Sequence, residues 1–243
     1  GTLRQTFSQV PFLALTATAD EVTRQDIIQR LQLAQPKVHV GGFDRPNIRY
    51  SVAEKNQPIK QLLDFLKSPS AHQQSGIIYC LSRKRVEEVA LKLQQHGLSA
   101  QAYHAGLPAE IRQTVHQRFI RDEVAIVVAT VAFGMGIDKP NVRFVVHYDV
   151  PKNIEGYYQE TGRAGRDGLP SEALLLYGAQ DVVTARYFVN KNPNEAQQRI
   201  ESHKLEAMVQ FAEAQICRRK VLLHYFGEAL DEDCGNCDVC LNP

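Results

Sequence analysis

The chain has 243 residues, which is enough for one α/β core and a smaller appended module. Its 28 lysines and arginines balance 27 acidic residues, so a net charge of +1 provides no overall basic field and any binding of nucleic acid must be local. Apolar runs such as 124–133 are well short of the roughly 18 residues of a membrane span, and no signal-peptide pattern opens the chain, so we expect a soluble cytoplasmic protein without a membrane partner.

The N-terminal part is expected to form a strand, a turn and a helix. Residues 12–16 are a short apolar run that predicts the strand. Thr18 and Glu21 have the spacing of a capping box, and an apolar helical stripe follows them. Residues 41–46 then break the pattern with two glycines and a proline, which predicts a linker.

From residue 76 to residue 177 apolar strands alternate with helices. The expected strands are 77–80, 100–104, 124–130, 144–147 and 173–177, and the expected helices are 84–96, 108–122 and 154–160. Alternation of this kind predicts a parallel sheet with helices on both faces, which binds ligands at the carboxyl ends of its strands. After Gly178 only helices are expected, with 195–214 and 218–226 as the main ones.

Polar or glycine-rich segments follow several of these strands. They are residues 16–19, 82–83, 103–106 and 130–138. Hydroxyls, backbone amides and arginines hold the phosphates of a nucleic-acid backbone. Taken alone, Ser82 is typical of a helix N-cap and His104 of a structural histidine, but their shared sheet edge with Thr130 favours a phosphate-binding role.

Two arginines, Arg163 and Arg166, lie three residues apart in a glycine-rich turn. Guanidinium groups offer bidentate donors to phosphate oxygens, and the glycines let the backbone approach a ligand closely. The alternative is an ordinary solvated helix end. Asp138, which follows Gly134 and Gly136, has the chemistry to hold a ribose hydroxyl or to pair with one of the arginines.

Three segments resemble conserved motifs of superfamily 2 helicases. Residues 127–147 are similar to motif V, 159–166 to motif VI and 16–19 to motif III, and together with the cysteine pattern below they resemble the RecQ family of DNA helicases. The resemblance implies ATP-dependent 3′ to 5′ movement on single-stranded DNA, action on partly duplex DNA, and roles in recombination and repair. It implies that 1–42 end a first RecA-like lobe, that 43–178 form the second lobe, and that 179–243 form a helical zinc-binding module.

The resemblance also implies roles for single residues. Arg163 and Arg166 would stabilise charge on the γ-phosphate across a cleft, and Gln159 would sense the nucleotide or its water. The remaining positions implied are Asp138, Gly134 and Gly136 beside the nucleotide, Ser82, Arg83, His104 and Thr130 along the single-stranded DNA, and Thr16 and Thr18 in coupling hydrolysis to strand movement.

The sequence also departs from a complete enzyme of this kind. It contains neither a phosphate-binding Gly-x-x-x-x-Gly-Lys-Ser/Thr loop nor an Asp-Glu-x-His motif for Mg²⁺. The resemblance therefore implies that ATP and Mg²⁺ bind in the complete enzyme with a first lobe as partner, and we expect the chain alone to be inactive. The alternatives are an RNA helicase, whose motif VI usually begins His-Arg, and a non-catalytic module that binds nucleic acid or protein.

Four of the five cysteines fall within the last 27 residues. Sixteen residues separate Cys217 from Cys234, and Cys237 and Cys240 follow at Cys-x-x-Cys spacing, which suits a closed structural zinc site of four thiolates. An iron–sulfur cluster and disulfides are the alternatives. His203 and His224 are stray candidate ligands that a four-thiol site does not need. The resemblance favours zinc, and Cys80 is expected to be a core residue.

Overall fold

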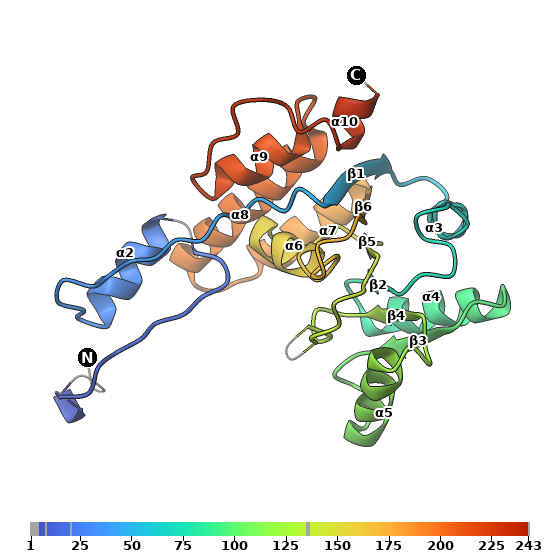
Figure 1. The fold of residues 1–243 in the computed structure, drawn as a ribbon, viewed down its shortest axis with the longest axis horizontal. Helices are drawn as coiled ribbons and strands as arrows, with labels where there is room; N and C mark the ends of the chain where they lie inside the picture. The colour runs from blue at the N-terminus through green and yellow to red at the C-terminus, as the bar shows by residue number, and fades with distance from the viewer. Residues whose placement is uncertain (1–4, 8, 20, 135–136, 243) are drawn as a thin grey trace.

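Six parallel strands form the centre of the structure (Figure 1). The computed structural model describes residues 5–7, 9–19, 21–134 and 137–242. The sheet order is β1-β6-β5-β2-β4-β3, and every connection between successive strands other than that from β4 to β5 carries an α-helix. The strands are β1 Ile48–Glu54, β2 Gly76–Tyr79, β3 Ala100–Tyr103, β4 Ile126–Ala129, β5 Phe144–His147 and β6 Ser171–Tyr177.

Helices cover both faces because successive side chains of a strand point in opposite directions. Ile78 packs on one face with the helices α3, Pro58–Leu66, and α4, Arg83–Gln95. Its neighbour Ile77 belongs to the core cluster of the other face, to which four further helices contribute side chains. These are α5 Ala109–Ile120, α6 Ile154–Thr161, α8 Glu195–Glu213 and α9 Arg218–Tyr225. The predicted α/β sheet with helices on both faces is confirmed.

The helical part after β6 packs directly on the sheet. It contains α7, Ala179–Asn190, then α8 and α9, and ends in the short α10, Asp238–Leu241. Phe211 of α8 and Leu222 of α9 belong to the same core as Tyr50 of β1. The Asp238 carboxylate accepts a hydrogen bond from the backbone N–H of Val52 at 2.9 Å, which ties α10 to the first strand. The division at 178/179 stays a prediction, but packing is continuous across it.

Two sequence-based expectations were wrong or incomplete. The helix after Thr18 is present as α2, Glu21–Arg30, but residues 12–16 form no strand. A strand needs a neighbour, and 12–16 pair with no strand of the described residues and leave Leu13 and Leu15 82% and 84% exposed. The sequence-based expectations also omitted β1, which follows the predicted linker and pairs with β6 from Ile48 to Glu54.

No helix in the described part of the chain combines the length and the apolar character that crossing a membrane requires. The helix α4 instead presents one apolar side to the sheet, where buried Val86, Val89 and Leu93 share one face, and one polar side to solvent. Because all six strands are parallel, their carboxyl ends lie at the same edge of the sheet, and the polar segments that follow the strands are at that edge.

Candidate functional site

A cavity of about 600 Å³ lies at the carboxyl ends of β2, β4 and β5. A parallel sheet opens its ligand crevice at this edge because the loops that leave neighbouring strands diverge there. The predicted site residues that line it are Thr18, Thr130, Gly134, Gln159 and Arg163. Segments that are more than 100 residues apart in the sequence thus share one cavity.

The arginine turn, residues 162–168, begins where α6 ends. Asn153 starts that helix by accepting a hydrogen bond from the N–H of Gly156 at 2.7 Å. Arg163 then reaches back to the loop after β4, where its guanidinium donates a hydrogen bond to the carbonyl of Gly134. A Cβ at Gly134 would lie 2.6 Å from Arg163 Nη2, so a larger residue here would displace the guanidinium.

The second arginine makes a different contact. Arg166 Nη1 donates to the Ile137 carbonyl and to Asp138 Oδ1, both at 3.1 Å. The pair is solvent-exposed, with side chains 38% and 90% accessible, so it is weak and easily exchanged for another partner. Of the pairings expected for Asp138, the one with Arg166 is present. Gly136 lies outside the described residues.

A hydrogen bond joins the N-terminal segment to α6. Gln159 Nε2 donates to Thr18 Oγ1 at 2.6 Å. Thr18 is held in a local turn, because Thr16 Oγ1 accepts from its N–H at 3.3 Å and donates to its carbonyl at 3.1 Å. The two predicted threonines and the predicted glutamine therefore form one contact, although 141 residues separate Thr18 from Gln159.

The other predicted residues lie farther along the same edge, beyond the cavity lining. Ser82 caps α4 by accepting from the N–H of Arg85 at 3.2 Å, which confirms the N-cap interpretation. His104 is buried, its Nε2 lies 3.0 Å from Glu87 Oε1, and its Nδ1 has no hydrogen-bond partner in the described part of the chain. Arg83 and His104 both approach Gly106, where a Cβ would lie 3.0 Å from Arg83 Nη1 and 3.1 Å from His104 Nδ1.

A buried acid–base pair in the cavity wall escaped the sequence interpretation. His147 Nε2 lies 2.6 Å from Glu160 Oε2, and the imidazole stacks on Tyr79 with ring centroids 5.4 Å apart. The hydroxyl of Tyr79 donates to the Phe133 carbonyl at 2.8 Å, and burial raises the pKa of this phenol. A histidine inside the apolar run 144–147 was the signal, since a buried polar side chain needs a partner.

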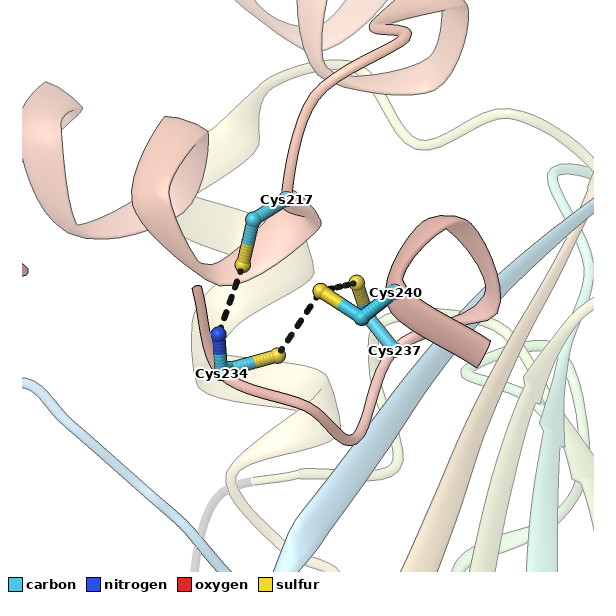
Figure 2. Close-up of side chains that lie close together, drawn as sticks. All are labelled: Cys217, Cys234, Cys237 and Cys240. Atoms are coloured by element: carbon cyan, nitrogen blue, oxygen red, sulfur yellow. Dashed lines mark hydrogen bonds between the residues drawn. The ribbon is translucent and has the colours of Figure 1, made fainter. Parts of the chain in front are cut away.

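The four predicted cysteines form one cluster (Figure 2). Their Sγ atoms all lie within 4.8 Å of one another, although one thiol precedes α9 and the other three surround the start of α10. Among the described residues, neither His203 nor His224 belongs to a group that could hold a metal ion. Four converging thiols without a fifth candidate fit a tetrahedral closed site.

Backbone N–H groups face these sulfurs. The N–H of Cys234 donates to Cys217 Sγ, that of Asn236 to Cys234 Sγ and that of Arg218 to Cys237 Sγ, each at 3.4 Å. Burial raises the pKa of the Cys217 thiol, but the hydrogen bonds outweigh it and lower the pKa to about 7. Burial raises the pKa of Cys234 and Cys240, so Cys217 is the thiol whose hydrogen bonds favour thiolate, the form that binds metal.

Comparisons with known proteins agree with this geometry. The family described as "Helicase conserved C-terminal domain" matches residues 54–168, and the family described as "RecQ zinc-binding" matches residues 179–241. An ATP-dependent DNA helicase RecQ of Pasteurella multocida is 54% identical over the whole chain. A putative ATP-dependent RNA helicase of Acanthamoeba polyphaga mimivirus is 44% identical over 98% of the chain. The chain spans 38% and 43% of the lengths of these two relatives.

Among solved structures, S. cerevisiae Dbp5 bound to RNA and ADP BeF3 matches 78% of this chain and 54% of its own, with a TM-score of 0.60 and 19% identity. At this identity the likeness concerns the fold alone, and it supports the RecA-like character of the sheet. The zinc-binding family match covers all four clustered cysteines, so the helical part after β6 is a zinc-binding module.

Proposed function

The chain belongs to the RecQ helicase family, and on this premise we propose that it forms the part of an ATP-dependent DNA helicase that completes the nucleotide site and contacts single-stranded DNA. The observation that carries the proposal is the cavity at the carboxyl edge of the sheet, where Thr18, Gln159 and Arg163 meet. These three residues come from the segments that resemble motifs III and VI. A movement of either segment on binding nucleotide would therefore be passed to the other.

In this proposal Arg163 and Arg166 stabilise the charge that develops on the γ-phosphate during hydrolysis. Arg163 Nε is buried and has no hydrogen-bond partner within the described residues, so the guanidinium keeps a donor for a ligand. Arg166 exchanges its exposed contact with Asp138 for the nucleotide at little cost. An arginine of this kind typically contributes about 10³ to 10⁵ in rate.

Gln159 senses the nucleotide or its water, and its hydrogen bond to Thr18 passes the state of the site to the N-terminal segment. Gly134 takes part because its carbonyl holds Arg163. Gly136 and Asp138 are proposed beside the nucleotide on the resemblance to motif V, with Asp138 also linking this site to DNA.

Single-stranded DNA is proposed to follow the outer part of the same edge. Arg83 is exposed and lies beside buried His104, while Ser82 and Thr130 follow the neighbouring strands β2 and β4. Hydroxyls and an arginine of this arrangement bind phosphate without reading sequence. Because these phosphate contacts are local, a net charge of +1 for the whole chain is compatible with DNA binding.

The cysteine cluster is proposed to hold one structural zinc ion through Cys217, Cys234, Cys237 and Cys240. Zinc in a four-thiolate site supplies folding free energy rather than reactivity. ATP and Mg²⁺ are proposed to bind in the complete enzyme, on a first lobe that brings the phosphate-binding loop. We propose 3′ to 5′ translocation, action on single-stranded and partly duplex DNA, and roles in recombination and repair.

The test uses the full-length protein that contains this chain. We expect Arg163→Ala and Arg166→Ala each to lower the kcat of DNA-stimulated ATP hydrolysis by about 10³-fold or more while zinc content is unchanged. Arg186→Ala is the matched control, since Arg186 is exposed and pairs with Glu206 on the helical module. Unchanged kcat in both variants would refute the proposed roles of the arginines.

Two further measurements separate the alternatives. The chain alone is expected to show no DNA-stimulated ATPase, and adding a separately expressed first lobe is expected to restore it. Activity of the chain alone, or failure of the two parts to complement, would favour a different assignment. Stimulation by single-stranded RNA but not by DNA would identify an RNA helicase, the activity named for the mimivirus relative.

A further inference from the structure

Arg45, which lies outside the segments that resemble helicase motifs, holds the arginine turn through hydrogen bonds. Arg45 Nη1 donates to the carbonyl of Gly162 at 3.0 Å, and its Nη2 donates to the carbonyls of Ala164 at 2.9 Å and Gly165 at 3.0 Å. These carbonyls flank Arg163 on both sides. Carbonyls at a helix end lack partners within the helix, and the planar guanidinium fork can satisfy several of them at once.

Asn47, two residues after Arg45, also holds the turn. Asn47 Nδ2 donates to the carbonyl of Gly165 at 2.8 Å and to that of Leu169 at 2.9 Å. Gly165 has a φ of +57°, a left-handed conformation that glycine tolerates. The turn that carries both candidate phosphate-binding arginines is therefore held from outside along its whole length.

The segment that carries Arg45, residues 43–48, is itself clamped by the zinc-binding module. Arg219 Nη2, two residues after Cys217, donates to the carbonyls of Arg45 and Pro46 at 3.3 Å and to that of Ile48 at 2.8 Å. The Arg219 residue is 5% exposed. Because a buried guanidinium needs hydrogen-bond partners, its three bonds to backbone carbonyls fix the path of this segment.

Aromatic packing completes the clamp on segment 43–48. The ring of Phe43 stacks on Phe226 at the end of α9, with centroids 4.6 Å apart and planes 9° apart. The N–H of Phe43 donates to Glu228 Oε2 at 2.6 Å, and its carbonyl accepts from the hydroxyl of Tyr158 at 2.9 Å. Segment 43–48 consequently lies between the zinc-binding module and α6, with contacts to both.

We propose that Arg45 is a positioning residue that holds the turn 162–165 so that Arg163 and Arg166 face the nucleotide, and that Arg219 anchors it from the zinc-binding module. This inference rests on the proposed function of the two arginines. Arg45 has no ion pair within the described residues, so its guanidinium acts on the turn through carbonyls rather than through charge. A misplacement of about 1 Å costs roughly 10²-fold in rate, which makes such a grip consequential.

The substitution Arg45→Lys keeps the positive charge but removes the two-armed guanidinium, so it tests whether that geometry is needed. A single ammonium group on a flexible stem presents its donors from one point and does not reproduce the two-armed contact. In the full-length protein we expect Arg45→Lys to lower the kcat of DNA-stimulated ATP hydrolysis about 10- to 100-fold, with KM for ATP changed less than about threefold. Arg49→Ala is the matched control, because Arg49 lies four residues after Arg45 on β1, is 41% exposed in its side chain and reaches Glu172 at 3.8 Å.

A combined variant distinguishes positioning from a general loss of structure. If Arg45 acts through Arg163 and Arg166, adding Arg45→Lys to a variant that carries both Arg163→Ala and Arg166→Ala lowers the residual kcat by no more than about twofold, because both groups that it positions are gone. Additive losses would overturn the inference. Arg45→Lys with wild-type kcat, while Arg163→Ala and Arg166→Ala are impaired, would overturn it and leave the proposed function intact.

Zinc content and DNA binding provide the remaining readouts. We expect Arg45→Lys to retain one equivalent of zinc and unchanged affinity for oligo(dT) by fluorescence anisotropy. Loss of zinc would overturn the inference, since Arg45 would then serve the module and not the turn. Should Arg163→Ala and Arg166→Ala both keep full kcat, the proposed function fails, and that result is distinct from the failure of Arg45 alone.

Discussion

Gly165→Ala tests whether the arginine turn is built by close packing or by backbone conformation alone. A Cβ at this position would lie 2.3 Å from Asn47 Nδ2, 2.6 Å from Ser171 Oγ and 2.8 Å from the Leu169 carbonyl oxygen. The last contact is with backbone, so rotation of a side chain cannot relieve it. The substitution therefore adds overpacking to the cost of a left-handed alanine.

The magnitude follows from these two contributions. A left-handed conformation costs a residue with a Cβ about 1–2 kcal/mol, and overpacking costs about 1–3 kcal/mol more. We expect Gly165→Ala to lower the free energy of unfolding by about 2–5 kcal/mol. For a chain of this length each kcal/mol corresponds to about 2–4 °C in Tm.

Gly168→Ala is the matched control in the same turn. Gly168 has a φ of +80°, and a Cβ there meets no atom within 4 Å, so this substitution has the backbone cost alone. We expect it to lower Tm by about 2–8 °C. The assay is thermal unfolding of both variants by circular dichroism at saturating zinc. Equal decreases in Tm would refute the reasoning, because the close packing around Gly165 would then contribute nothing.

Three further changes test neighbouring features. Cys237→Ser is expected to abolish binding of one equivalent of zinc and to give insoluble or proteolysed protein, and full solubility with unchanged melting would contradict this. A hydrogen bond from Arg143 holds the pKa of Asp167 below its usual value, so its contribution is present above the ordinary carboxyl pKa and is lost as the pH falls through the lowered one. Asp167→Asn should therefore lower the urea midpoint at pH 6 but progressively less below pH of about 4, and a difference that does not depend on pH would contradict the pairing. Gly134→Ala should displace Arg163 and lower kcat in the full-length protein without loss of zinc, whereas unchanged kcat would show that this contact has no catalytic effect.

The sheet between residues 76 and 177 was predictable because its central strands β2, β4 and β5 are buried at every position. Runs such as 144–147 are apolar without interruption, and the helix stripes between them have the period of an amphipathic helix. Strand β1 was not predicted, because its sequence mixes Arg49, Ser51 and Glu54 with apolar residues. It lies at an edge of the sheet, where polar side chains are tolerated. An apolar run was also insufficient evidence for a strand at 12–16, since pairing depends on a partner strand.

The cysteine cluster and the gathering of Thr18, Gln159 and Arg163 were predictable from spacing and from motif resemblance. The contacts of Arg45 and Arg219 were not, because a guanidinium that binds carbonyls leaves no pattern in a single sequence. Pro46 beside Arg45 marked the segment as irregular backbone, and irregular backbone has free carbonyls and exposed N–H groups. A charged side chain in such a segment is a candidate for holding another irregular segment.

The zinc-binding module and the sheet are more tightly joined than a division at 178/179 suggests. Phe211 and Leu222 pack in one core with Ile48 and Tyr157, and Cys237 belongs to the same cluster of buried residues. A module that shares its core with the sheet cannot unfold alone, since its loss would expose the apolar side of β1 and α6 to water. A zinc ion held by the four cysteines would therefore stabilise the arginine turn as well as the module, and the physical path is short: Cys217 precedes α9, α9 carries Arg219, and Arg219 holds the segment that grips the turn.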